Sequence, residues 1–220
     1  MKNTLLIYSG GLDSSSALYI YKDKIALAVS FNYGSRHNEQ EIKYAKLNCK
    51  KLDIEHIVIN MQEAFKGIKS ALTDRTQSIP EGHYESESMK STVVPFRNGI
   101  MLSVATGIAD SRGLKNVMLG SHSGDHAVYP DCTPIFNSGI RAAMVNGTDS
   151  RVNLLVPFMT ISKKELAFKG LKAGMIPEQT YSCYKGGEEQ CGVCSTCIER
   201  RWALGELTDK EVEDIKNEYN

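Results

Sequence analysis

The chain lacks net charge, because 26 Lys and Arg residues balance 26 Asp and Glu residues among its 220 positions. Such a chain has no general electrostatic attraction for nucleic acid or anionic membranes, so we expect neither as a partner. It also lacks any run near the roughly 18 apolar residues that a membrane span needs. The N-terminus runs directly into an apolar segment and a glycine-rich loop, which argues against a secretory leader. These absences predict a cytoplasmic protein.

Internal repeats and low-complexity tracts are lacking as well. Hydrophobic residues make up 41% of the chain and charged residues 24%, which is ordinary for a soluble protein with one sizeable core. Six cysteines are present, and four of them lie between Cys183 and Cys197. In a cytoplasmic chain, such clustering favours a metal site over disulfides.

Apolar runs alternate with helical patterns along the chain. Strands are predicted at residues 4–8, 25–31, 55–60, 117–120 and 153–157, and helices at 14–21, 39–51, 97–108, 134–146, 162–173 and from 208 onward. Capping boxes open the last two helices, at Ser162 and Thr208. This alternation predicts an α/β fold, a parallel sheet with helices on both faces. Residues 66–90 show no clear period and are expected to form a long loop or lid with at most a short helix.

Residues 9–14, Ser-Gly-Gly-Leu-Asp-Ser, lie between the first predicted strand and helix. Backbone N–H groups and the helix dipole favour an anion at such a junction. Gly10 and Gly11 let the backbone turn sharply and approach a phosphate, and nearby serines offer hydroxyl donors. Asp13 fits there if it caps the helix, accepts a backbone N–H or helps to hold Mg²⁺. The loop matches neither the kinase-type phosphate loop nor the dinucleotide-binding glycine pattern.

This loop resembles the PP-loop of the N-type ATP pyrophosphatases, which include GMP synthetase, NAD synthetase and argininosuccinate synthetase. The resemblance implies an adenine nucleotide alpha hydrolase-like, Rossmann-like fold. It also implies that ATP is split to AMP and pyrophosphate, with AMP passing first to a substrate oxygen. The residues expected to bind ATP, with Mg²⁺, are Ser9, Gly10, Gly11, Leu12, Asp13, Ser14, Ser15 and Arg36.

The cysteine cluster supplies four thiolates close in sequence, Cys183, Cys191, Cys194 and Cys197. Four such ligands, with no nearby His or open position, favour a closed structural Zn²⁺ site. An iron–sulfur cluster or a redox pair are the alternatives. We expect the cluster to shape one wall of the site. The predicted organisation is a PP-loop domain at residues 1–175, followed by a zinc-binding region and terminal helix at 176–220.

Four further segments narrow the resemblance: residues 31–37 (Phe-Asn-Tyr-Gly-Ser-Arg-His), 91–98 (Ser-Thr-Val-Val-Pro-Phe-Arg-Asn), 124–132 (Gly-Asp-His-Ala-Val-Tyr-Pro-Asp-Cys) and 182–187 (Ser-Cys-Tyr-Lys-Gly-Gly). With the PP-loop they resemble the 7-cyano-7-deazaguanine synthase family. The resemblance implies a ligase that converts 7-carboxy-7-deazaguanine, ammonia and ATP into the nitrile through an adenylated acid and an amide. It further implies queuosine or other deazapurine biosynthesis and a homodimer. A glutaminase domain is not visible, so free ammonia or a separate donor is expected.

The resemblance and side-chain chemistry together give the candidate substrate residues. The fork of Arg97 suits a phosphate or the substrate carboxylate. Asn98, Asp125, Asp131 and Tyr129 are expected to bind or stack on the base. Other polar side chains have open roles: His37 at the phosphate end, His122 and His126 as general acid–base groups or exposed loop residues, and Cys132 as a packed thiol.

The chain departs from the family pattern at Thr133 and Ile135, where relatives carry Arg and an acidic residue. If these positions face the site, the enzyme stops at 7-amido-7-deazaguanine, a variant suited to phage DNA modification; if they form a surface ion pair, little changes. Three other functions stay open: a sulfur-using tRNA-modifying PP-loop enzyme, a zinc-ribbon binding module with a degenerate loop, and attachment of deazapurines to proteins. The apolar stretch 201–207 is a candidate dimer interface.

Overall fold

Five parallel strands form the centre of the molecule in the computed structural model, which describes residues 2–82 and 87–219. They are β1 (Thr4–Ile7), β2 (Ile25–Asn32), β3 (Glu55–Asn60), β4 (Asn116–Met118) and β5 (Asn153–Leu155), in the order β3-β2-β1-β4-β5. This order places β1 beside β2 on one side and β4 on the other. Successive connections therefore leave β1 in opposite directions, and a crevice forms at the carboxyl ends of β1 and β4.

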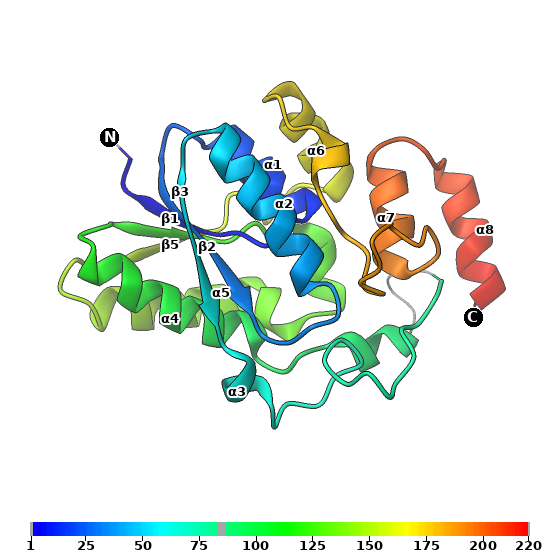
Figure 1. Cartoon of the computed structure of the whole chain (residues 1–220), viewed down its shortest axis with the longest axis horizontal. Helices are drawn as coiled ribbons and strands as arrows, with labels where there is room; N and C mark the ends of the chain where they lie inside the picture. The colour runs from blue at the N-terminus through cyan, green and yellow to red at the C-terminus, as the bar shows by residue number, and fades with distance from the viewer. Residues whose placement is uncertain (1, 83–86, 220) are drawn as a thin grey trace.

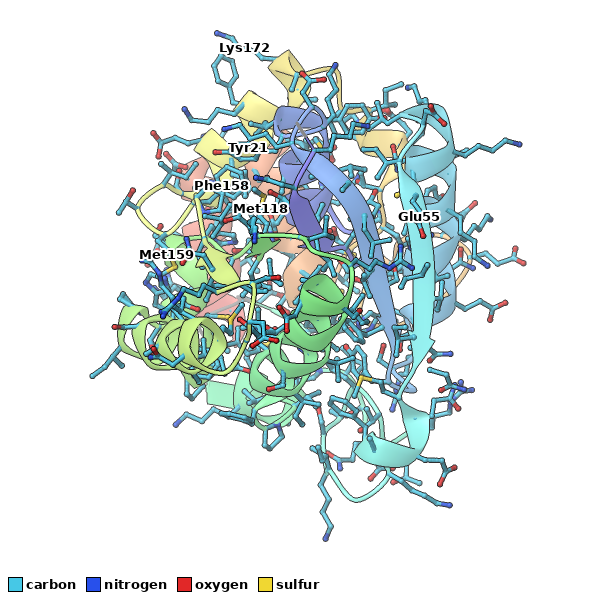
Figure 2. The ribbon with its side chains drawn as sticks, turned by 90° about the vertical axis from the view of Figure 1, so that its left-hand side faces the viewer. Tyr21, Glu55, Met118, Phe158, Met159 and Lys172 are labelled. Atoms are coloured by element: carbon cyan, nitrogen blue, oxygen red, sulfur yellow. The ribbon has the colours of Figure 1, made fainter. Side chains whose placement is uncertain are left out.

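Helices cover both faces of this sheet, as the sequence predicts (Figure 1). On one face lie α1 (Leu12–Ile20), α2 (Asn38–Lys51) and α6 (Lys163–Lys172), and on the other α4 (Arg97–Ser111) and α5 (Pro134–Asn146). Alternate strand residues supply the two cores, with Leu5 in one and Leu6 in the other. Figure 2 shows Met118, Phe158 and Tyr21 on the α1 and α6 side, far from Glu55 on the edge strand β3.

Short elements complete the fold. They are α3 (Gln62–Phe65), η1 (Glu87–Thr92), η2 (Ser123–Ala127), η3 (Pro130–Cys132), η4 (Pro177–Gln179), α7 (Ser195–Ala203) and α8 (Asp209–Tyr219). Both predicted capping boxes are confirmed: Glu165 N donates to Ser162 Oγ over 3.2 Å, and Glu211 N donates to Thr208 Oγ1 over 3.2 Å. The loop expected at residues 66–90 begins directly after α3 and ends within η1. Its residues 83–86 lie outside the described part of the chain.

The sequence analysis missed α7, because this helix begins inside the cysteine cluster and its buried face is not wholly apolar. Its last residue, Ala203, packs with Leu12 and Tyr19 of α1 in a small third core. Ala203 and Leu207 are both buried within the chain. The apolar stretch 201–207 thus packs internally at these two positions, and its role as a dimer interface stays a prediction. Across the described ranges, the structure has no helix with the length and apolar character of a membrane span.

Candidate functional site

A cavity of about 210 Å³ opens at the carboxyl ends of the central strands. It receives side chains from the PP-loop, α2, the start of α4, the segment after β4, α6 and the cysteine region. The polar and aromatic residues among those lining it include Ser9, Asp13, Ser14, Tyr33, His37, Glu41, Arg97, Asn98, Asp125, Tyr129, Lys163, Tyr181, Ser182 and Tyr184. Most of the candidates predicted from sequence therefore meet in one place, although they come from segments far apart in the chain.

The PP-loop has the geometry of an anion site. Gly11 caps α1 without any side-chain hydrogen bond, so the first-turn N–H groups of the helix have no side-chain acceptor. Ser9 Oγ accepts from Gly11 N over 3.1 Å and lies 3.0 Å from Ser14 Oγ, which places both hydroxyls on the cavity side. Gly10 has φ +95°, and a Cβ there would collide with the carbonyl oxygen of Glu41. Only glycine fits at position 10.

Three predicted ATP ligands lie away from this cavity lining. Ser15 is buried and its Oγ lies 3.1 Å from the hydroxyl of Tyr8, so it packs beneath the loop. Arg36 donates from Nη2 to the carbonyls of Asp74, over 2.7 Å, and Gln77. Gly10 packs against α2, as described above. These three residues position the loop and its neighbours, and their direct contact with ATP stays a prediction.

Lys163, at the first position of α6, is a functional residue that sequence reasoning missed. It is only 6% exposed, and its Nζ lies 3.1 Å from Asp13 Oδ2 and 2.7 Å from Glu199 Oε2. Burial alone would raise the pKa of Asp13, but the Lys163 ammonium outweighs it and holds that pKa below its ordinary value. Asp13 is therefore a carboxylate beside the PP-loop, and Lys163 balances its charge. In the sequence, Lys163 is hidden because it lies within the Ser162 capping box.

Arg97 begins α4 and enters an aromatic cage. Its Nη1 donates to the Tyr33 hydroxyl over 3.3 Å, and its guanidinium carbon lies 5.8 Å and 5.9 Å from the ring centres of Tyr33 and Tyr129. The Tyr129 and Tyr184 hydroxyls lie 3.0 Å apart and close the cage. Burial would lower the pKa of Arg97, but the three tyrosines raise it well above its ordinary value. Within the described ranges, no carboxylate comes within ion-pair distance of this cation, so its charge is available to an anionic ligand.

Asp131 supports this arrangement from outside the cavity lining. It is 8% exposed, and its Oδ2 accepts from the backbone N–H of Asn98 over 2.7 Å, which fixes the first turn of α4. The Asn98 side chain donates to the Asp131 carbonyl over 3.3 Å and lies 3.2 Å from Cys132 Sγ. Burial raises the pKa of Cys132 far above the usual thiol value. Cys132 is therefore an inert packed thiol, in agreement with the sequence interpretation.

His122 and Asp125 follow β4 and lie beside the PP-loop. Asp125 Oδ2 accepts from the backbone N–H of His122 over 3.0 Å, and His122 Nδ1 accepts from Gly124 N over 3.1 Å. His122 is only 1% exposed. This burial contradicts the interpretation of His122 as an exposed loop histidine, because the cap of η2 turns the ring inward against Asp13.

Glu41, which was not predicted from the sequence, lies at the start of α2 beside His37, which was predicted at the phosphate end. Their side chains lie 3.7 Å apart, and the Tyr33 hydroxyl lies 3.3 Å from His37 Nε2. Burial raises the pKa of Glu41 to about 8, against the lowering effect of Arg97. Burial, followed by Arg97, lowers the pKa of His37 to about 3. At neutral pH the pair is therefore an uncharged imidazole and a largely protonated carboxyl. Glu41 is spaced four residues from the buried Ala45, a helical signal that was available in the sequence.

The four clustered cysteines meet as predicted, with all four sulfur atoms within 4.8 Å of one another. Two of the Sγ pairs, Cys183 with Cys194 and Cys191 with Cys197, are 4.0 Å apart. A tetrahedral Zn²⁺ with bonds of about 2.3 Å requires sulfur separations of about 3.8 Å. The donor set and its spacing thus fit a metal ion of this kind. Neighbours of the ligands, including Ser182, Tyr184 and Thr196, line the cavity, so the cluster shapes one wall.

The two departures from the family pattern lie outside the cavity. Thr133 caps α5, because its Oγ1 accepts from Phe136 N over 3.3 Å and donates to the Pro130 carbonyl over 2.9 Å. Ile135 is 84% exposed. Neither residue lines the cavity, so neither departure alters the charge of the cavity lining in this chain.

Comparisons with known proteins agree on one family. The family described as "Queuosine biosynthesis protein QueC" matches residues 3–208. The chain is 46% identical over 203 residues to a protein named 7-cyano-7-deazaguanine synthase from Porphyromonas gingivalis, covering 92% of each. It is 43% identical to a protein of the same name from Desulfotalea psychrophila, covering 93% of this chain and 94% of the relative. An NMN synthetase structure from Francisella tularensis shares the fold, with a TM-score of 0.51 and 15% identity over 99% of this chain and 83% of its own.

Proposed function

The chain belongs to the QueC family, and from this premise we propose that it is an ATP-dependent ligase that converts 7-carboxy-7-deazaguanine and ammonia into 7-cyano-7-deazaguanine. The observation that carries the proposal is a single cavity lined by both the PP-loop and Arg97, a cation with no carboxylate at ion-pair distance within the described ranges. A loop suited to triphosphate and a cation suited to a carboxylate are the two requirements of acid adenylation.

The first half of the proposed reaction makes an amide. A carboxylate oxygen is a poor leaving group, so one oxygen of the acid attacks the α-phosphorus of ATP and pyrophosphate departs. Arg97 would hold the carboxylate in line, and the PP-loop N–H and hydroxyl groups of Ser9 and Ser14 would stabilise phosphate charge. Ammonia then attacks the acyl carbon, AMP leaves with the oxygen, and the amide forms after loss of a proton.

The second half dehydrates the amide. The amide oxygen attacks the α-phosphorus of a second ATP, and pyrophosphate leaves again. Loss of AMP and two N–H protons converts the C–N bond to the nitrile, so the departing oxygen leaves as phosphate oxygen. This step needs a site that excludes water, and the rings of the buried Tyr33 and Tyr129 and of the partly buried Tyr184 would enclose the reacting carbon. The uncharged His37 and the largely protonated Glu41 are placed to relay protons near the PP-loop.

We propose that the base lies against Tyr129, with Asp125 and Asn98 on its polar edge, because all three line the cavity beyond Arg97. Asp131 would act by positioning Asn98, and Arg36 by holding the loop at 74–77. The PP-loop and sheet at 1–175 would hold both substrates, and the region at 176–220 would complete the wall. In the living cell we propose that the enzyme works as a homodimer with free ammonia or a separate ammonia donor.

Two metal ions fit the donor atoms. Asp13 Oδ1 is buried and has no hydrogen-bond partner among the described residues, and a carboxylate oxygen beside a triphosphate suits Mg²⁺, which would neutralise phosphate charge. Cys183, Cys191, Cys194 and Cys197 would hold Zn²⁺, which would fix the cavity wall. The chain's own residues bind and orient the substrates in either case.

The test is direct. Purified protein is incubated with 7-carboxy-7-deazaguanine, ATP, Mg²⁺ and ammonium, and the products are identified by mass spectrometry. We expect the nitrile with AMP and pyrophosphate, and two ATP consumed for each nitrile. Accumulation of the amide alone would establish the variant that stops at 7-amido-7-deazaguanine. Absence of pyrophosphate release with this acid would overturn the proposal.

A further inference from the structure

A second cavity, of about 300 Å³, lies behind the first, between α7, α8 and the start of α6. Figure 1 shows α7 and α8 side by side at the end of the molecule where the central strands finish. Ile198, Trp202 and Val212 give this cavity an apolar wall, and Glu199 and Lys163 give it a polar end. Lys163 lines both cavities, so the two spaces meet at this side chain.

The boundary between the two cavities is formed by the side chain of Lys163, whose head group is itself a primary ammonium. Lys163 Nζ lies between Asp13 Oδ2, at 3.1 Å on the ATP side, and Glu199 Oε2, at 2.7 Å on the side of the second cavity. A primary ammonium donates three N–H bonds, and the same carboxylates would accept from a free ammonium ion. The flexible four-carbon stem of a lysine allows its head group to yield to such an ion.

His122 adds an unused hydrogen-bond donor at the same partition. Its Nδ1 accepts from Gly124 N, so the neutral ring carries its hydrogen on Nε2. Nε2 has no hydrogen-bond partner among the described residues, although the ring is 1% exposed; the nearest carboxylate oxygens are Asp125 Oδ1 at 3.7 Å and Asp13 Oδ2 at 3.9 Å. A buried donor without an acceptor is costly, and the lone pair of an ammonia molecule would satisfy it. Carboxylate acceptors beside one N–H donor match the hydrogen-bonding pattern of ammonia.

We infer that the second cavity is the ammonium entrance of the enzyme, and that Glu199, Lys163 and His122 pass ammonia from it to the ATP cavity. The inference rests on the proposed ligase function. Ammonia, in equilibrium with ammonium in solution, enters in its neutral form and keeps its lone pair. That lone pair forms the C–N bond at the acyl carbon while the bond from this carbon to the adenylate oxygen breaks and AMP leaves.

Two features support this direction of entry. The apolar wall formed by Ile198, Trp202 and Val212 favours neutral ammonia over water and ions. A separate entrance also lets ammonia reach the adenylate while ATP and the base fill the mouth of the first cavity.

A plug in the second cavity tests the inference. In Val212→Trp the indole fills the space between α7 and α8, whereas Val212→Ala leaves it open and serves as the matched control. We expect Val212→Trp to raise the KM for ammonium about tenfold or more, with the KM for ATP unchanged. Ammonia-independent adenylation, measured as exchange of labelled pyrophosphate into ATP with the acid present, should stay within about twofold of the wild-type rate. An unchanged KM for ammonium would overturn the inference.

If Val212→Trp loses adenylation as well, the isosteric variant Glu199→Gln decides. A KM for ammonium raised about tenfold, against an unchanged KM for ATP, supports the entrance. Equal effects on both, or none on ammonium, overturn it. Failure of the wild-type protein to exchange pyrophosphate with the deazaguanine acid would instead refute the proposed function, so the two failures are distinguishable.

Discussion

Arg97 concentrates the charge complementarity of the site in one residue. Its cation lies against the rings of Tyr33 and Tyr129, the Tyr184 hydroxyl contacts that of Tyr129, and Asp131 fixes the start of its helix. Because an aromatic cage satisfies a guanidinium without neutralising it, the residue keeps its full charge for a ligand. The planar fork that binds a carboxylate through two N–H bonds is specific to Arg.

Replacing Arg97 tests this role. We expect Arg97→Lys to lower kcat/KM for the acid by about 10²-fold, since a lysine cannot make the two parallel bonds. The KM for ATP should change little, because the PP-loop is intact. Steady-state kinetics with each substrate varied in turn would measure both values. A larger effect on ATP than on the acid would place Arg97 on the phosphates.

Removing the Asp131 carboxylate should destabilise the folded protein. In Asp131→Ala the buried N–H of Asn98 loses its acceptor, which should lower the free energy of unfolding by about 1–3 kcal/mol. Asp131→Asn keeps an acceptor oxygen and should cost clearly less. Urea unfolding of the three proteins measures the difference. Equal costs for the two variants would contradict the assigned bond.

The raised pKa of Glu41 should make the free energy of unfolding depend on pH. Its pKa is about 8 in the folded chain and 4.5 in the unfolded reference, so between these values the folded state binds more protons. The contribution of Glu41 to the free energy of unfolding is fully present below about pH 4.5, where the carboxyl is protonated in both states. It is lost as pH rises toward about 8. We therefore expect Glu41→Gln to gain free energy of unfolding relative to wild type as pH rises from about 5 to 8. His37, whose pKa is lowered, acts in the opposite sense below pH 6.5 in both proteins and cancels in the comparison.

Urea unfolding at several pH values measures that difference for wild type and Glu41→Gln. Parallel curves for the two proteins across this range would show that Glu41 ionises normally in the folded state.

At the scale of elements, two sets of contacts fix the cysteine region, which forms one wall of the cavity. The four sulfur atoms gather on one side, and Arg200 of α7 donates to Thr180 Oγ1 over 2.6 Å and to the Pro177 carbonyl over 2.5 Å on the other. Tyr181 N donates to the Gly10 carbonyl over 3.0 Å and joins this wall to the PP-loop. A metal held by the four cysteines would therefore be mechanically linked to the geometry of the PP-loop.

Metal removal should show this link. We expect one bound zinc per chain by elemental mass spectrometry, and chelation or Cys197→Ser should lower the Tm by about 10 °C and weaken ATP binding together. The control Cys49→Ala, remote from the cluster, should keep the metal. Full activity and an unchanged Tm in metal-free protein would mean that the cysteines are not a structural site.

At the scale of the whole molecule, strand order decides where ATP binds. The loops after β1 and β4 meet at the crevice between these strands, and a Cβ on Gly120 would lie 3.2 Å from the Ser14 Cα. The two loops thus approach each other as closely as their backbones allow. Any added atom at Gly120 presses on the PP-loop.

The prediction for the whole molecule is that Gly120→Ala weakens ATP binding about tenfold, seen as a smaller rise in Tm at a fixed ATP concentration. Gly107→Ala is the matched control, because Gly107 lies in α4 and a Cβ added there would meet no other atom within 4 Å. This variant should leave the ATP-induced shift in Tm unchanged. An identical shift in both variants would contradict the close approach.

By itself, the sequence determined the class of fold, the PP-loop and the cysteine ligands. Local patterns sufficed for these, because strand and helix periods, capping boxes and short glycine and cysteine motifs need no distant partner. Residues 55–60 and 134–146 were predicted as the structure has them, for this reason. Arg97, Asn98, Asp125 and Tyr129 were selected by resemblance and do line the cavity.

Only the tertiary structure decided which residues meet. Asp13, Lys163 and Glu199 lie far apart along the chain, so the pairing of Lys163 with both carboxylates was not visible in any local pattern. The structure also placed Asp131 behind the cavity and Ile135 on the surface. The physical reason is that burial and electrostatic pairing arise when the sheet brings distant loops to one edge, and no local period encodes that meeting.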